Sequence, residues 1–141
     1  MVNQTWKFGE EFFERIKEFK SRVLPYAVSP GIPELIEGIR KYFIKQNIKF
    51  ESNEIMVTTG GTEALLYSMM TLCDPDDEIL VPEPFYTNYL TLANMINAKL
   101  VPIITNIEDN FHLPEKSKIE KLITNKTKAI LINNPGNPTG V

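Results

Sequence analysis

Apolar and polar positions along this chain follow two alternating periods. Apolar residues three and four positions apart, as on one face of a helix, fill five stretches, and short apolar runs of strand length separate the later ones. The helical stretches cover residues 10–22, 33–46, 62–73, 86–96 and 114–123. The strand-like runs cover residues 55–57, 78–82, 98–105 and 128–133. This alternation predicts an α/β fold, a parallel-sheet α/β/α sandwich with right-handed crossovers.

Each predicted helix carries an apolar stripe. The first ends before Pro25, and the second has Pro33 in its first turn. The first three stripes are Phe12, Phe13, Ile16, Phe19 and Val23; Leu35, Ile36, Ile39 and Phe43; and Leu65, Leu66, Met69, Met70 and Cys73. We expect the second and third stripes to be buried, with both methionines and Cys73 as core residues. The last two are Tyr86, Tyr89, Leu90, Ala93 and Ile96, and then Ile119, Leu122 and Ile123.

Two strands carry a signal of their position in the sheet. Pro102 removes a backbone donor from the third strand, which places this strand at a sheet edge. The fourth strand, at 128–133, is an unbroken apolar run of the kind that is covered on both faces.

Composition narrows the class of protein. With 141 residues, 43% of them hydrophobic and 23% charged, the chain is one ordinary globular domain or a piece of a larger one. The net charge of −3 and the scattered lysines give no nucleic-acid surface, and no apolar run is long enough for a membrane span. The single cysteine, Cys73, excludes an internal disulfide framework and a cysteine metal cluster, so we assign no metal site. Without a signal-peptide pattern at the start, we expect a cytoplasmic protein.

The carboxyl ends of the predicted strands carry the candidate chemistry, because ligands bind at that edge of a parallel sheet. Gly60, Gly61 and Thr62 follow the first strand and open a helix. Glycines let a ligand approach the backbone, and the unpaired N–H groups of a helix N-terminus attract anions, to which Thr62 adds a hydroxyl. The competing interpretation is a tight connection with no ligand.

Two further loops end at the same edge. Pro82 and Pro84 stiffen the loop after the second strand and would hold the ring of Phe85 or Tyr86 in place. In the loop at 133–140, Asn137 stands between two prolines as a positioned donor. Together the three loops suit a phosphorylated, planar, aromatic ligand with an oxygen substituent. Taken singly, they are a tight turn, a core aromatic residue and a loop asparagine. The loop after the edge strand, 106–110, has the pattern of a plain surface loop.

Four motifs resemble the class I/II aminotransferases, the pyridoxal-phosphate enzymes of fold type I. They are Tyr26…Gly31-Ile-Pro-Glu-Leu, Val57-Thr-Thr-Gly-Gly-Thr-Glu-Ala, Asp76-Asp-Glu-Ile-Leu-Val-Pro-Glu-Pro-Phe-Tyr, and Thr127-Lys-Ala-Ile-Leu-Ile-Asn-Asn-Pro-Gly-Asn-Pro-Thr-Gly. They occur in the family's order and spacing, and the match looks closest to aspartate-aminotransferase-like enzymes. The resemblance implies an N-terminal helical segment at 1–25, followed at 26–141 by the first part of the pyridoxal-phosphate-binding large domain, which is incomplete here.

The resemblance also implies roles for individual residues. Gly61 and Thr62 would hold the phosphate of pyridoxal 5'-phosphate, with Gly60 shaping the turn. Tyr86 matches the aromatic residue that stacks on the pyridine ring, and Asn137 matches the asparagine that bonds the phenolic oxygen of the cofactor. Tyr26 matches a tyrosine that reaches the phosphate of the neighbouring subunit, which implies a homodimer. Cis peptide bonds are expected before Pro84 and Pro138.

The sequence departs from the family pattern at its end. The family's Schiff-base lysine, the aspartate on the pyridine nitrogen and the arginine for the substrate carboxylate all lie after the Asn-Pro-Thr-Gly motif, so we assign no catalytic residue. We therefore interpret the chain as an N-terminal fragment, inactive alone, of an aminotransferase that moves an amino group between an amino acid and a 2-oxo acid. The sheet of such a fragment would have an open edge, which invites pairing or aggregation.

Two other interpretations stay open at this point. One is a non-catalytic α/β domain that binds a phosphorylated ligand or a partner protein. The other is a nucleotide-binding doubly wound domain, although the chain has neither Gly-x-Gly-x-x-Gly nor a Gly-Lys-Ser/Thr loop. His112, the one histidine, is expected on a surface loop, and Glu63 has no assigned role.

Overall fold

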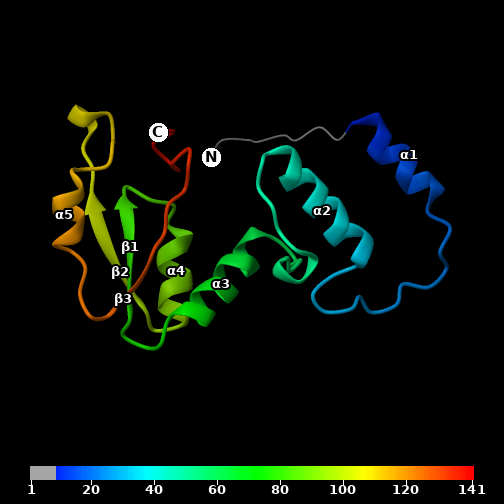
Figure 1. The fold of residues 1–141 in the computed structure, drawn as a ribbon, viewed down its shortest axis with the longest axis horizontal. Coiled ribbons are helices and arrows are strands. Elements are labelled where there is room, and N and C mark those ends of the chain that lie inside the picture. Colours follow the sequence, from blue (N-terminus) through cyan, green and yellow to red (C-terminus); the bar gives the residue numbers. More distant parts are fainter. Residues whose placement is uncertain (1–8) are drawn as a thin grey trace. The chain divides into compact units, whose positions relative to one another are not determined.

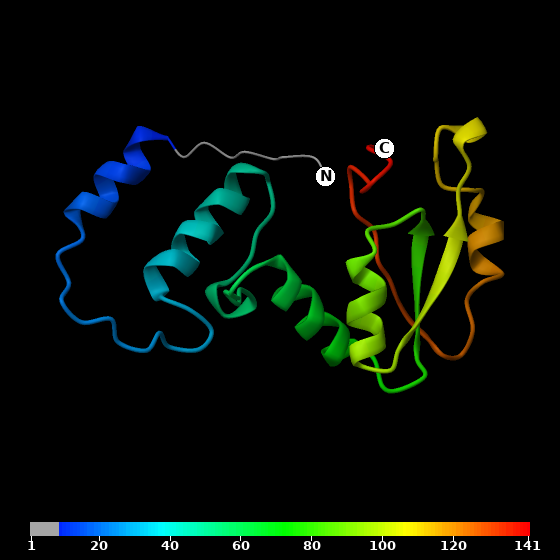
Figure 2. The same cartoon turned by 180° about the vertical axis from the view of Figure 1, so that it is seen from behind.

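The computed structural model describes residues 9–141 and divides into two compact units, one ending at Met56 and the other spanning Val57–Val141. Figures 1 and 2 show the helices of the first unit and the small sheet of the second from opposite sides. The predicted division between an N-terminal segment at 1–25 and a large domain from residue 26 stays a prediction.

The first unit contains α1 (Glu10–Glu18), α2 (Pro33–Lys45) and the short 3-10 helix η1 (Ser52–Glu54). Helix α1 has acidic residues in its first turn and basic residues in its last, which complements the helix dipole. It ends at Glu18, four residues before the predicted end, and its apolar stripe is exposed. Helix α2 begins at Pro33 as expected and buries Ile36.

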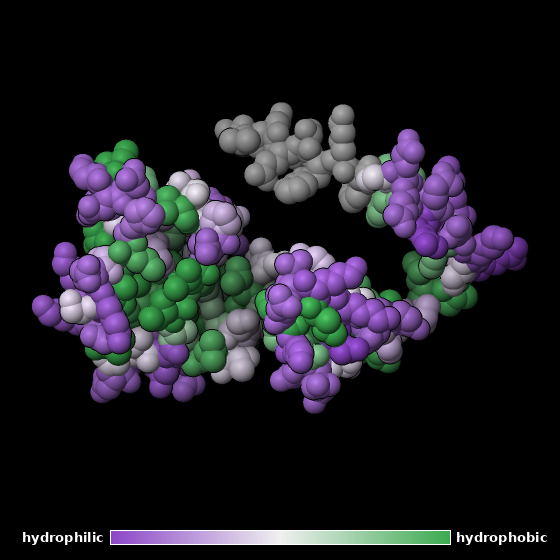
Figure 3. All heavy atoms as spheres, turned by 45° about the horizontal axis from the view of Figure 1, so that its top comes forward, coloured by the Kyte–Doolittle hydropathy of each residue, from purple (hydrophilic) through white to green (hydrophobic). Residues whose placement is uncertain are grey.

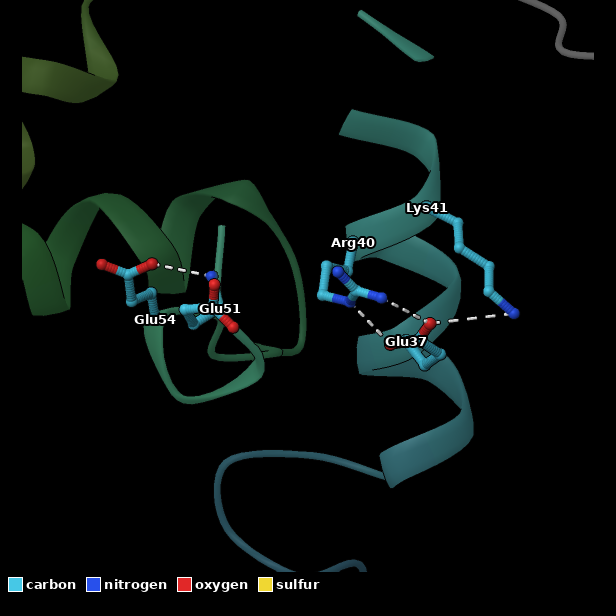
Figure 4. Close-up of polar contacts among 5 residues, drawn as sticks. All are labelled: Glu37, Arg40, Lys41, Glu51 and Glu54. Atoms are coloured by element: carbon cyan, nitrogen blue, oxygen red, sulfur yellow. Dashed lines mark hydrogen bonds and ion pairs between the residues drawn. The ribbon is translucent and has the colours of Figure 1, made fainter. Parts of the chain in front are cut away.

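Polar contacts (Figure 4) and a ring contact stabilise the segment from α2 to η1. Arg40 donates two hydrogen bonds to Glu37, at 2.7 and 3.0 Å, which lowers the pKa of that carboxyl. The Glu51 N–H donates to Glu54 Oε2 at 2.7 Å in a capping box that starts η1. The rings of Phe43 and Phe50 meet edge to face, 5.2 Å apart between centroids. The contact between Phe43 and Phe50 joins α2 to the segment that precedes η1.

The second unit is a parallel sheet with helices on both faces. Its elements are α3 (Gly61–Leu72), β1 (Glu78–Glu83), α4 (Asn88–Met95), β2 (Lys99–Ile104), η2 (Ile107–Asp109), α5 (Lys116–Glu120) and β3 (Thr127–Ile130). The strand order is β2-β1-β3, and both pairings are parallel. Helices α3 and α4 lie on one side of the sheet and α5 on the other (Figures 1 and 2). The predicted α/β fold with a parallel sheet is confirmed.

The strand predictions are confirmed in part. Pro102 lies in β2 opposite Val81 of β1, and β2 is an edge strand, as predicted. The run at 55–57 is not a strand, because no other part of residues 9–141 pairs with it, so the sheet has three strands where four were predicted. Strand β3 is shorter than predicted and leaves Ile130 exposed, so the prediction that it is covered on both faces is wrong.

The core lies between the sheet and the helices. Ile79, Leu80 and Val81 of β1 are fully buried, and Ile103 of β2 is buried beside them. Ile79 packs in a cluster with Met69 of α3 and Leu92 of α4, which is lined further by Leu65, Leu66, Cys73, Ile96, Leu100, Ala129 and Leu131. Met70 faces outward, so its predicted burial is wrong. Within residues 9–141, no helix is long and apolar enough to span a bilayer.

Candidate functional site

The turn that opens α3 is built from glycines and closed by side-chain hydrogen bonds. Gly60 caps the helix, and the Ala64 N–H donates to its carbonyl at 3.2 Å. The Thr58 hydroxyl donates to the same carbonyl at 2.9 Å. Glu63 folds back from the first helical turn, and its Oε2 accepts the Thr59 N–H at 2.6 Å. Hydrogen bonds therefore hold the turn at the Gly60 carbonyl and at the Thr59 N–H.

The glycines of this turn have open space beside them. A Cβ placed on Gly60 or on Gly61 would meet no atom within 4 Å, so the fold does not require glycine at either position for room. The N–H groups of Gly61 and Thr62 have no hydrogen-bond acceptor within residues 9–141. Such N–H groups at the positive end of a helix are suited to an anion that comes close to the backbone.

Glu63 is the acidic group nearest these donors in the chain, and its charge is satisfied locally. The hydrogen bond from the Thr59 N–H, and then that from the Tyr67 hydroxyl at 3.1 Å, lower the pKa of the Glu63 carboxyl. The same carboxylate raises the pKa of Tyr67. Glu63 is thus a charged acceptor used by its own helix.

The loop after β1 presents stacked aromatic rings. Phe85 lies nearly parallel to Tyr89 of α4, with centroids 6.4 Å apart, and Tyr86 meets Tyr89 edge-on at 5.6 Å. The Glu83–Pro84 peptide bond is cis, as expected. The carbonyl of Glu83 accepts both the N–H and the hydroxyl of Thr105, at 3.1 and 2.7 Å, which ties this loop to the end of β2.

The loop after β3 is folded on itself around Gly136. The Gly136 N–H donates to Val141 O at 2.6 Å, and the Gly140 N–H donates to Gly136 O at 2.7 Å. A Cβ on Gly136 would lie 2.7 Å from Thr139 Oγ1 and 3.2 Å from Val141 O, so a side chain here would need both neighbours to shift. The Asn137–Pro138 bond is cis as expected, and Asn134–Pro135 is cis as well. Asn137 lies exposed at the apex of this loop.

The loops after β1 and β3 together line a cleft of about 400 Å³ at the carboxyl edge of the sheet. Asn137 lines it together with Phe85 of the loop after β1 and Tyr89 of α4, whereas Tyr86 does not. The connection after β2, which the sequence pattern indicates as plain surface loop, contributes Phe111 and His112. His112 is exposed, as expected of a surface loop. No pattern in the sequence predicts this contribution.

The other predicted site residues lie outside this cleft. Gly60, Gly61 and Thr62 are in the same unit but do not line it. Tyr26 belongs to the first unit, where its side chain is fully exposed. Among residues 9–141, no three His, Cys, Asp or Glu side chains are grouped to hold a metal ion.

Comparison with known proteins decides the family. Residues 11–141 match the family described as aminotransferase class I and II. The chain belongs to this family. A protein of Methanocaldococcus jannaschii named probable aspartate aminotransferase is 40% identical over 116 residues, which cover 82% of this chain and 30% of the relative.

Solved aminotransferase structures have the same fold. The aspartate aminotransferase of Thermotoga maritima superposes with a TM-score of 0.82 at 34% identity, over 94% of this chain and 34% of that one. The alanine aminotransferase of Pyrococcus furiosus gives a TM-score of 0.80 at 38% identity, over 94% of this chain and 33% of that one. The chain thus spans about a third of the length of these class I and II aminotransferases. It is similar to aspartate aminotransferases in both sequence and fold.

Proposed function

We propose that these residues supply part of the cofactor site of a pyridoxal-phosphate-dependent aminotransferase, which moves an amino group between an amino acid and a 2-oxo acid. The observation that carries the proposal is the family match over residues 11–141, which contains all four motifs of the sequence. Because the chain spans about a third of its relatives, the activity is proposed for the complete enzyme. The relatives include proteins named aspartate aminotransferase and alanine aminotransferase, so we propose no particular amino acid as the substrate.

The turn at Gly60–Thr62 fits the phosphate of the cofactor. A phosphate dianion needs several N–H or O–H donors, and this turn offers the N–H groups of Gly61 and Thr62 together with the Thr62 hydroxyl. The open space over both glycines leaves room for a phosphate oxygen against the backbone. We assign this turn as the phosphate-binding element.

The two loops at the sheet edge fit the ring of the cofactor. Tyr86 is held edge-on by Tyr89 and is partly exposed, which leaves its ring available for stacking. Asn137 would donate its amide to the phenolic oxygen of the cofactor. When bound, pyridoxal phosphate supplies the electron sink for amino-group transfer. In this chain Tyr86 would orient the cofactor ring by stacking on it. Asn137 would donate a hydrogen bond from its side-chain amide to the phenolic oxygen.

Tyr26 extends the proposal to the assembly. Its side chain contacts little within its own unit, as expected if it serves the phosphate site of a second subunit. We therefore propose a homodimer. We further propose a cytoplasmic protein with an N-terminal segment at 1–25, of which residues 1–8 lie outside the described residues.

Ligand-dependent melting of the chain tests this function. Pyridoxamine 5'-phosphate has the phosphate and ring of the cofactor but no aldehyde, so it cannot react with surface lysines. We expect it to raise the melting temperature more than equal concentrations of pyridoxamine or of ATP. A larger shift with ATP would favour a nucleotide-binding domain, and no shift with any of the three would contradict the proposal.

A second experiment tests the expectation that the chain alone is inactive. Treatment with pyridoxal phosphate and then borohydride should leave no stoichiometric adduct at a single lysine, because no lysine here matches the family's Schiff-base position. Peptide mapping by mass spectrometry would reveal such an adduct. One lysine modified in every molecule would contradict this expectation.

A further inference from the structure

Glu63 closes a ring of hydrogen bonds around the proposed phosphate-binding turn. Its Oε2 accepts the Thr59 N–H at 2.6 Å, so the side chain spans Gly60, Gly61 and Thr62. Its Oε1 accepts the Tyr67 hydroxyl at 3.1 Å, one helical turn further along α3. Helix α3 thus holds one end of the bridge, and Thr59, just before the two glycines, holds the other.

The bridge spans two adjacent glycines. Gly60 and Gly61 are adjacent glycines, and no side chain or backbone atom lies within 4 Å of a Cβ on either. Glycine loses more backbone freedom on ordering than any other residue. A turn ordered before the ligand arrives therefore binds more tightly than a turn that the ligand must order.

The bridge also determines which N–H groups are left for a ligand. The Glu63 carboxylate accepts the hydrogen bond of the Thr59 N–H, which lies before the glycines, and the Gly60 carbonyl accepts that of the Thr58 hydroxyl. The N–H groups of Gly61 and Thr62 remain without an acceptor within residues 9–141. The carboxylate, which would repel a phosphate by its charge alone, already accepts two hydrogen bonds.

We propose that Glu63 is a positioning residue for the phosphate of the ligand, with Tyr67 holding its carboxylate in place. This inference rests on the proposed function, since it assigns the anion at Gly61 and Thr62 to the cofactor phosphate. It makes a prediction opposite in sign to simple electrostatics. Removing an acidic residue beside an anion site should strengthen binding, whereas removing this one should weaken it.

The test compares pyridoxamine 5'-phosphate with pyridoxamine, which lacks the phosphate, by equilibrium titration of the full chain. The dissociation constant of pyridoxamine divided by that of pyridoxamine 5'-phosphate measures how much the phosphate adds to binding. This ratio separates the phosphate contribution from ring binding. Glu63→Ala should lower this ratio by roughly tenfold, with pyridoxamine binding unchanged. Glu63→Gln keeps an oxygen for the Thr59 N–H and should restore the ratio to the parent level or above.

Two further variants separate positioning from folding. Tyr67→Phe removes only the hydroxyl and should give a ratio between those of the parent and of Glu63→Ala. Because Tyr67→Phe keeps the Glu63 carboxylate, its ratio reports positioning even if Glu63→Ala lowers the melting temperature. Glu34→Ala makes the same change in the first turn of α2 and should leave the ratio unchanged.

Several outcomes would overturn the inference. They are an unchanged or higher ratio in Glu63→Ala, a Glu63→Gln ratio as low as that of Glu63→Ala, and an equal loss of affinity for both ligands. A parent ratio near one is a different failure, because it removes the phosphate site itself and the proposed function with it.

Discussion

At the scale of single residues, the glycines of this chain serve two distinct purposes. Gly136 has Thr139 Oγ1 and Val141 O close to where a side chain would begin, so a larger residue would crowd the turn. Gly60 and Gly61 have open space in the same position. A glycine that the fold does not need is consistent with the close approach of a ligand to the backbone.

Gly61→Ala therefore separates folding from binding. Alanine is a better helix former at the first position of α3, so the free energy of unfolding should stay the same or rise by up to about 1 kcal/mol. The added methyl group stands in the space assigned to the phosphate, so affinity for pyridoxamine 5'-phosphate should fall. Urea unfolding and ligand titration measure the two quantities. A large loss of stability would show that Gly61 is needed by the fold.

Glu63 also predicts a pH dependence. Its folded-state pKa is lowered, first by the Thr59 N–H and then by the Tyr67 hydroxyl. A lowered pKa contributes stability that is fully present above the unfolded-state value of about 4.3 and is lost as the pH falls through the folded value. The melting temperature of Glu63→Gln should therefore fall less than that of the parent between about pH 5 and pH 3.

The control for this pH dependence is a second carboxyl. Glu37 also has a lowered pKa, through its hydrogen bonds with Arg40, and it lies in the first unit. Glu37→Gln should also reduce the fall of the melting temperature at acidic pH. The effects of the two substitutions should add, because the residues share no partner. If the melting temperatures of the parent and of Glu63→Gln fall equally at acidic pH, the Glu63 hydrogen bonds are not maintained in solution.

At the scale of elements, α3 provides a matched pair of methionines. Met69 is 4% exposed in the core cluster, whereas its neighbour Met70 is 58% exposed. Met69→Ala should lower the free energy of unfolding by about 2–5 kcal/mol, and Met70→Ala should change it by less than about 0.5 kcal/mol. Both substitutions have the same effect on helix propensity, so their difference, measured by urea unfolding, reports burial. Equal losses would contradict the packing of α3 against β1.

The periodicity of the sequence predicts which elements exist better than it predicts what covers them. Helices at 33 and 61, strands at 78 and 99, and the edge position of β2 follow from spacing and from Pro102. Met69 and Met70 both fit an apolar stripe, but only the position of the sheet decides which is buried. The run at 55–57 has strand composition, yet a strand exists only where another segment accepts its hydrogen bonds.

The candidate site shows the same limit. The three glycine-, aromatic- and asparagine-containing loops could be located from the sequence, because each follows an apolar run that ends in turn residues. The contribution of Phe111 and His112 to the cleft could not, since it depends on how the connection after β2 folds back over the sheet. The bridge from Glu63 to Thr59 likewise depends on a side-chain rotamer, which no spacing rule specifies.

At the scale of the whole molecule, the sheet has two unlike edges. On β2, Pro102 interrupts the row of backbone donors, whereas β3 has no proline between Thr127 and Ile130. Exposed apolar side chains gather on the sheet-containing unit, the green surface of its atoms in Figure 3. An exposed strand edge with apolar flanks is a template for pairing with another chain.

We therefore expect the isolated chain to associate through β3. Ile130→Lys should reduce association, because paired copies of the strand would bring like charges together. Ile104→Lys makes the same change at the end of β2, where the residue is 56% exposed against 46% for Ile130, and should have little effect. Sedimentation velocity over a range of chain concentrations measures the apparent mass. Association that persists in Ile130→Lys, or that Ile104→Lys reduces equally, would place the contact on another surface.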